Sequence, residues 1–185
     1  MPPAGASTGS DIVLRCAVTG PVPLPDRLPE VVWRAGLDLN PLFPSRADDR
    51  RWLASLIWPE QIDRAERLDR ALDLVAADPP RLDEGDLLVD LPGLLADAPT
   101  DATLVVFHSA VLAYLDHEQC ARFADVMVDL KRTRGVHWVS NEAPGVIAGA
   151  DIDPRPRGRF ILAHDKMPIA VTGPHGHSLA WLAHR

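Results

Sequence analysis

Short apolar runs alternate with amphipathic stretches along most of this chain. The run 103–107 carries no charge, which is the pattern of a central parallel strand buried on both faces. Similar runs predict further strands at 11–18, 31–39, 81–86, 136–140, 159–164, 169–172 and 178–183. The links between the runs from residue 159 onward are short, which favours antiparallel pairing in that part of the chain.

The amphipathic stretches have helical spacing. In 60–77 the apolar positions Ile62, Ala65, Leu68, Leu72 and Val75 repeat along one face. The same reasoning predicts helices at 48–58, 87–96, 110–114 and 118–134. Strands that alternate with helices and end in a hairpin indicate an α/β fold of three layers. We therefore predict a Rossmann-like, mostly parallel sheet with an antiparallel C-terminal hairpin.

Composition narrows the class of protein. The length of 185 residues suits one α/β domain, expected over 11–185, after a flexible lead-in at 1–10. The net charge of −7 argues against a dedicated nucleic-acid binder, because phosphate contacts need a basic face. No apolar run is long enough to cross a bilayer, so no membrane partner is expected. Two isolated cysteines and the absence of a signal peptide predict reduced thiols and a cytoplasmic location.

Polar residues stand at the C-terminal ends of several predicted strands. In open α/β sheets, ligands bind where strands end and helices begin. If these strands are parallel, their ends lie along one edge of one sheet. The candidate site residues are Asp38, Asn40, Asp86, His108, Ser109, Asn141 and Glu142.

Each of these candidates has an ordinary structural alternative. His108 is either a general base or substrate ligand, or a hydrogen-bonded polar residue at a strand end. Asp38 accepts hydrogen bonds from a ribose diol or caps the following loop. His175 and His177 fit a turn better than a chelate, because no matching ligands stand at metal spacing, so we predict no metal site.

A resemblance adds to this interpretation. Five sequence blocks occur in the expected order, at 34–41, 52–59, 105–112, 138–142 and 174–176. Together they resemble a bacterial family known as domain of unknown function 2332, from about residue 11 to the C-terminus. The family carries no settled activity.

More distantly, the layout is similar to class I S-adenosylmethionine-dependent methyltransferases. The resemblance implies that Asp38, with Asn40 beside it, meets the cofactor ribose and that Asp86 meets the adenine amine. Ser109 would lie at the cofactor, and His108 and Glu142 would face the methyl acceptor as catalytic residues. S-adenosylmethionine is therefore the expected cofactor.

The chain departs from that family at its start, because the usual first strand and Gly-rich loop are missing. We expect it to be the C-terminal part of a longer protein or a short version. The missing strand would be replaced by the strand at 11–18, by direct closure of the sheet, or by a partner chain. Two functions stay open: a methyltransferase-like domain, and a non-catalytic scaffold that binds a small molecule or a protein. Self-association into a homodimer is also left open.

Overall fold

The computed structural model describes residues 12–153 and 155–182, so the predicted lead-in at 1–10 lies outside the described residues. The chain separates into two compact units. One unit is built mainly from Arg27–Leu95, and the other combines Leu14–Asp26 with the chain from Ala96 onward. The single domain expected over 11–185 stays a prediction.

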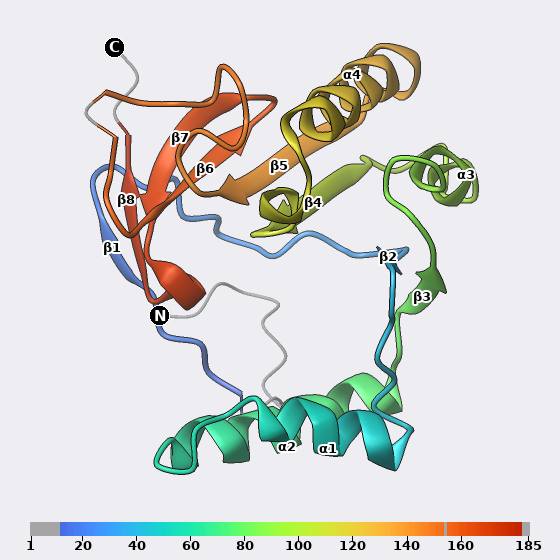
Figure 1. Cartoon of the computed structure of the whole chain (residues 1–185), viewed down its shortest axis with the longest axis vertical. Coiled ribbons are helices and arrows are strands. Elements are labelled where there is room, and N and C mark those ends of the chain that lie inside the picture. The colour runs from blue at the N-terminus through green and yellow to red at the C-terminus, as the bar shows by residue number, and fades with distance from the viewer. Residues whose placement is uncertain (1–11, 154, 183–185) are drawn as a thin grey trace. The chain divides into compact units, whose positions relative to one another are not determined.

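The second unit contains a six-stranded sheet (Figure 1). Its strands are β1 (Ala17–Thr19), β4 (Val105–Ser109), β5 (His137–Glu142), β6 (Phe160–His164), β7 (Met167–Thr172) and β8 (Ser178–Trp181). They lie in the order β1-β8-β7-β6-β5-β4. The pairs β4–β5 and β1–β8 are parallel, and the pairs from β5 through β8 are antiparallel. The fold is therefore α/β with a mixed sheet, which corrects the expectation of a mostly parallel one. The three-layer Rossmann-like arrangement stays a prediction.

The helix α4 (His117–Arg134) packs on one face of this sheet (Figure 1). Phe123 of α4 meets the ring of Trp138 on β5 edge to face, with ring centroids 5.7 Å apart. The ends of α4 follow from local signals. Asp116 accepts a hydrogen bond from the Gln119 backbone N–H while the Gln119 side chain accepts from Asp116 N–H, which is a capping box. Gly135 ends the helix at φ 64°, in the left-handed region that glycine tolerates best.

The hairpin between β6 and β7 turns through two residues, Asp165 and Lys166. Both have positive φ, 51° and 67°, which is the conformation of a type I′ turn. The link between the strands predicted at 159–164 and 169–172 is thus shorter in the structure, and β7 begins already at Met167. Ile161, Ala163 and Ala170 on these strands are buried in the core of the unit.

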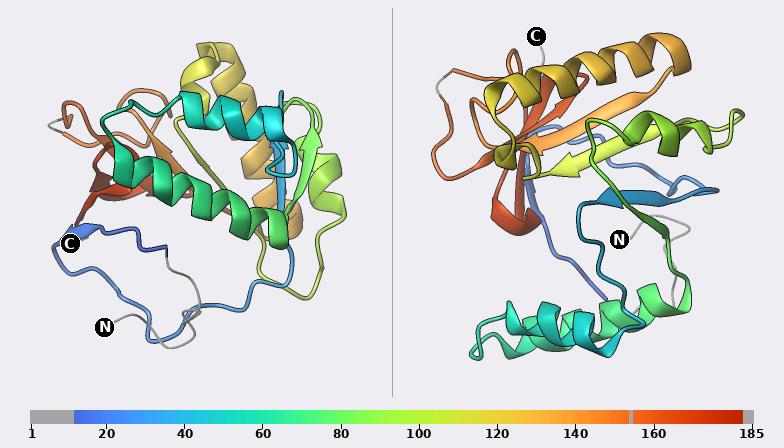
Figure 2. Two further views of the ribbon diagram at one scale, coloured as in Figure 1. Left: turned by 90° about the horizontal axis from the view of Figure 1, so that it is seen from below. Right: turned by 45° about the vertical axis from the view of Figure 1, so that its right-hand side comes forward.

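The first unit holds a separate, two-stranded parallel sheet of β2 (Ala35–Asp38) and β3 (Arg81–Glu84). The chain between these strands forms α1 (Ala47–Ser55) and α2 (Ile62–Ala77), which run side by side (Figure 2). Arg50 of α1 joins the helices through ion pairs with Asp69 and Asp73 of α2, at 2.8 and 2.7 Å. The short helix α3 (Leu91–Ala96) follows β3.

The strand β4 is not buried on both faces, contrary to the sequence-based expectation. It is the last strand of its sheet, and Val105 and Phe107 on one face are 47% and 79% exposed. An uncharged run shows that a strand tolerates burial, whereas its actual burial depends on neighbours that lie far away in sequence.

The strand order also corrects one way of replacing the missing first strand. Of the strand predicted at 11–18, only residues 17–18 are in β1, and β1 pairs with β8 at the opposite edge of the sheet from β4. β2 and β3 form a separate sheet in the other unit, so direct closure stays a prediction. β1 has only three residues, all exposed, and its register matches residues 178–180 of β8.

In the part of the chain that the structure describes, no helix combines the length and apolar character needed to cross a membrane.

Candidate functional site

The C-terminal ends of β4 and β5 bring several of the predicted site residues together. These strands are parallel and in register, with His108 opposite Ser140 and Ser109 opposite Asn141. Because side chains alternate along a strand, His108 shares a face with Glu142, whereas Ser109 and Asn141 share the other face. The ends of this strand pair are polar, as the sequence predicts.

His108 and Glu142 form a buried pair. His108 Nδ1 lies 2.7 Å from Glu142 Oε1, and the two side chains are 9% and 3% exposed. On the other side of the ring, Trp138 Nε1–H donates to His108 Nε2 at 2.9 Å. Since the indole N–H is only a donor, these partners assign the proton of a neutral imidazole to Nδ1. Both ring nitrogens are therefore engaged within the protein.

Glu142 also holds the turn that follows β4. Its Oε1 accepts hydrogen bonds from the backbone N–H groups of Val111 and Leu112, at 2.9 and 3.2 Å. These residues come directly after Ala110, whose φ of 55° turns the chain into the 3₁₀ helix η1 (Leu112–Tyr114). One carboxylate oxygen thus binds three donors, which places Glu142 in a structural role at the end of β5.

The second oxygen of Glu142, Oε2, is buried and has no hydrogen-bond partner. Glu142 lines a small cavity together with Ser140, Ala143, Gly145, Ile147, Ala150, Asp151 and Ile161. The cavity volume is about 10 Å³, which is room for one water molecule and far too little for a nucleoside.

On the opposite face of the sheet, Asn141 links Ser109 to β7. Asn141 Nδ2–H donates to Ser109 Oγ at 3.0 Å, and the Thr172 hydroxyl donates to Asn141 Oδ1 at 2.6 Å. Ser109 is exposed. The expected role of Ser109 at a cofactor stays a prediction.

The other three predicted residues lie in the first unit, at the ends of β2 and β3. Asp38 Oδ1 accepts a hydrogen bond from Asn40 N–H at 2.8 Å, so Asp38 caps the loop after β2. Asp86 Oδ1 accepts from Leu88 N–H at 2.7 Å. The Asp38 and Asp86 carboxylates are both exposed, and the β2–β3 pairing continues between them through a bond from Gly85 N–H to Asp38 O.

Gly85 is required for this tight approach. A Cβ atom on Gly85 would lie 2.8 Å from Asp90 Oδ2 and 2.9 Å from a methyl carbon of Leu37. The same Asp90 oxygen accepts a hydrogen bond from Asp86 N–H at 2.8 Å. The turn after β3 is therefore built around a glycine that lets Asp90 hold Asp86 in place.

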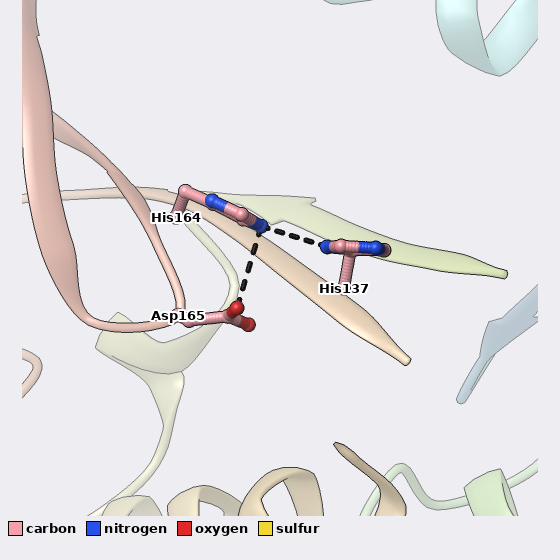
Figure 3. Close-up of side chains that lie close together, drawn as sticks. All are labelled: His137, His164 and Asp165. Atoms are coloured by element: carbon pink, nitrogen blue, oxygen red, sulfur yellow. Dashed lines mark hydrogen bonds and ion pairs between the residues drawn. The ribbon is translucent and has the colours of Figure 1, made fainter. Parts of the chain in front are cut away.

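A cluster that the sequence patterns did not predict lies at the start of β5 and the end of β6 (Figure 3). It consists of His137, His164 and Asp165, whose nearest donor atoms all lie within 4.8 Å of one another. The two histidines are 27 residues apart, and only the pairing of β5 with β6 brings them together. The available signal was the short link after the strand predicted at 159–164, because this strand and the one predicted at 136–140 both carry a histidine.

His175 and His177 lie in the turn η2 (Pro174–Gly176) and directly after it, where the sequence predicted a turn. His177 Nδ1 approaches Pro174 O at 2.5 Å, which occupies that nitrogen within the turn.

Comparison with known protein families identifies the family of this chain. A bacterial family described as uncharacterized protein conserved in bacteria, DUF2332, matches residues 4–181. The chain belongs to the DUF2332 family. No curated protein and no solved structure matches it. The expected family is therefore confirmed for this DUF2332 chain, and its similarity to methyltransferases stays a prediction.

Proposed function

We propose that this DUF2332 chain binds an adenosyl ligand, S-adenosylmethionine or a relative, at the ends of β2 and β3. The proposal rests on one observation. Two exposed carboxylates, Asp38 and Asp86, stand at the C-terminal ends of neighbouring parallel strands. That edge of a parallel pair is where α/β proteins bind nucleosides.

The chemistry of the two carboxylates suits the two ends of a nucleoside. A carboxylate accepts hydrogen bonds only, and a ribose diol and an adenine amine both donate. Asp38 uses Oδ1 for its cap on Asn40 N–H, which leaves Oδ2 as the acceptor offered to the diol. Asp86, whose Oδ1 binds Leu88 N–H, offers its second oxygen to the amine in the same way.

The proposal covers binding and assigns no methyl transfer to His108. A general base must present a free nitrogen to the acceptor proton. In this structure the two ring nitrogens of His108 are taken by Glu142 and Trp138.

Titration calorimetry with S-adenosylhomocysteine tests the proposal. We expect micromolar binding to the wild-type chain and at least tenfold weaker binding to Asp38→Asn. Asparagine keeps an oxygen for the cap on Asn40 N–H but loses the charge that strengthens hydrogen bonds from a diol. Asp63→Asn is the matched control, because Asp63 stands in the first turn of α2 in the same unit. No heat at millimolar ligand, or equal affinity of both variants, would refute the proposal.

A second candidate is a non-catalytic scaffold that self-associates through β4. Two features favour it: the pair His108–Glu142 is closed off by internal hydrogen bonds, and β4 ends its sheet with exposed Val105 and Phe107. An uncharged end strand is a template for pairing with another strand, and a second copy of β4 supplies one by two-fold symmetry.

Sedimentation velocity at several protein concentrations tests the scaffold. We expect a dimer in the wild type and a monomer in Phe107→Lys, because a charge on the strand blocks pairing. Val128→Lys on α4, at a residue 56% exposed, is the matched control and keeps the dimer. A wild-type chain that stays monomeric at about 100 µM would refute a dimer with a Kd in the micromolar range or below.

A further inference from the structure

Three side chains converge at the edge where β5 begins and β6 ends (Figure 3). His137 Nδ1 lies 3.0 Å from His164 Nε2. His164 Nε2 lies 3.4 Å from Asp165 Oδ2. Figure 3 shows that His164 Nε2 faces both His137 Nδ1 and the Asp165 carboxylate, so the three groups meet around this nitrogen.

The fold fixes this convergence through strand register. In the antiparallel pair β5–β6, His164 is opposite Val139. His137, two residues before Val139, is on the same face and is the diagonal neighbour of His164. Asp165 is the next residue, at the first position of the type I′ turn. The backbone therefore delivers two imidazoles and one carboxylate to one place without a flexible loop.

Two imidazole nitrogens 3.0 Å apart cannot both present a bare lone pair to each other, so a hydrogen atom or a metal ion must lie between or beside them. The N–H of one neutral ring, donating to the other, or a shared cation meets this need. Imidazole and carboxylate are ligands of zinc-class divalent metals, with metal–nitrogen bonds of about 2.0–2.1 Å. Two donors 3.0 Å apart can both reach one ion with bonds of that length, at an angle of roughly 90–95°.

The surroundings of Asp165 support a role as ligand. Trp138 N–H donates to Oδ1 at 3.0 Å and so fixes the plane of the carboxylate, as partners beyond the ligands do in metal sites. Lys131 Nζ lies 2.7 Å from Oδ2, the oxygen that faces His164. Asp165 is 17% exposed and Lys131 is 55% exposed, so the ammonium group can leave for solvent while the carboxylate stays.

We propose that His137 Nδ1, His164 Nε2 and Asp165 Oδ2 bind one zinc-class divalent cation in exchange for the Lys131 ammonium group. Three protein ligands leave at least one coordination position open, which is the arrangement of zinc sites that bind water or a further ligand. His137 is exposed, so this open position faces solvent. The metal site shares no residue with the proposed adenosyl site, so the two proposals are tested independently.

Calorimetric titration of the metal-free full chain with zinc chloride tests the proposal. We expect one equivalent of Zn²⁺ with micromolar affinity, and at least tenfold weaker binding in His164→Ala and in Asp165→Asn. Asparagine fits the positive φ at position 165 and keeps an oxygen for Trp138 N–H, so the hairpin is preserved. His117→Ala, which removes an exposed histidine at the start of α4, is the matched control and leaves the affinity unchanged.

Lys131→Met distinguishes a metal site from a cluster with only a structural role, because only a metal site predicts a change in Zn²⁺ affinity. Removal of the competing ammonium group should tighten Zn²⁺ binding at least threefold, because the carboxylate no longer exchanges one cation for another. Unchanged or weaker binding in this variant would show that Asp165 is not a ligand. No wild-type binding at 1 mM zinc, or binding that survives His164→Ala, would overturn the site itself. Circular dichroism of each variant confirms that it is folded.

Discussion

Removal of the Glu142 side chain tests whether this carboxylate holds the end of β5 together. Glu142 is 2% exposed, and its Oε1 accepts from His108, Val111 and Leu112. Glu142→Ala leaves these three donors without their acceptor. A buried donor that loses its partner costs about 1–3 kcal/mol, and water entering the vacated space recovers part of this. We expect a loss of about 3–5 kcal/mol in the free energy of unfolding, which is the cost of three donors less the part that water recovers.

Glu142→Gln separates the oxygen from the charge. Glutamine keeps an acceptor at the position of Oε1, and its amide group replaces Oε2, which has no partner now. The three hydrogen bonds then lose only their charge assistance, so we expect a smaller loss of about 1–2 kcal/mol. Asp125→Asn on α4 is the matched control, because this exposed carboxylate should change stability by less than about 0.5 kcal/mol.

Urea unfolding followed by circular dichroism measures these differences as shifts in the midpoint at constant slope. The reasoning requires the alanine variant to be clearly less stable than the glutamine variant. Equal losses would mean that the charge, rather than the acceptor oxygen, matters. A loss below about 1 kcal/mol in Glu142→Ala would refute the structural role of Glu142, because even one orphaned donor costs that much.

Three further changes follow from local features. Lys166→Gly should raise the melting temperature, because glycine adopts the positive φ of 67° at this position with less strain than lysine. The expected gain in the free energy of unfolding is about 0.5–1 kcal/mol, and a lower melting temperature would count against the turn geometry. Asp116→Ala should cost about 0.5–2 kcal/mol in urea unfolding by removing the cap of α4, and an unchanged midpoint would contradict that cap. Burial, together with the charges of Glu142 and Asp116, raises the pKa of the Cys120 thiol. Mass spectrometry after brief alkylation at pH 8.5 should therefore find exposed Cys16 modified well before Cys120. Faster modification of Cys120 than of Cys16 would contradict the raised pKa. The Cys120 thiol contributes to stability below the ordinary thiol pKa, and this contribution is lost as pH rises through the raised pKa.

Elements with local signals were predictable from the sequence. The helix expected at 118–134 is α4, because its apolar spacing and the glycine that ends it are encoded within the helix itself. The polar ends of β4 and β5 were also predictable, since alternation and strand ends are readable one strand at a time. The pairing of His108 with Glu142 needed one additional fact, that β4 and β5 are parallel neighbours.

Features that depend on distant neighbours were not predictable. Phe107 lies in an apolar run, but the run does not tell whether β4 is a central or an end strand. The exposure of Phe107 became clear only from the strand order. The cluster of His137, His164 and Asp165 depends on the β5–β6 register, which is set by turn geometry and pairing. A single strand read by itself cannot show either feature.

The pairing of β1 with β8 has a consequence for synthesis on the ribosome. Ala17 is opposite Ser178, so the first strand of the sheet needs a partner that is made about 160 residues later. At about 5–20 residues per second, β1 waits roughly 8–32 seconds after its own synthesis. Chaperones can bind the apolar side chains near β1 throughout that interval. These side chains, which stay exposed even in the folded chain, are Val13, Leu14 and Val18. The sheet is therefore completed only after β8 has emerged from the ribosomal tunnel.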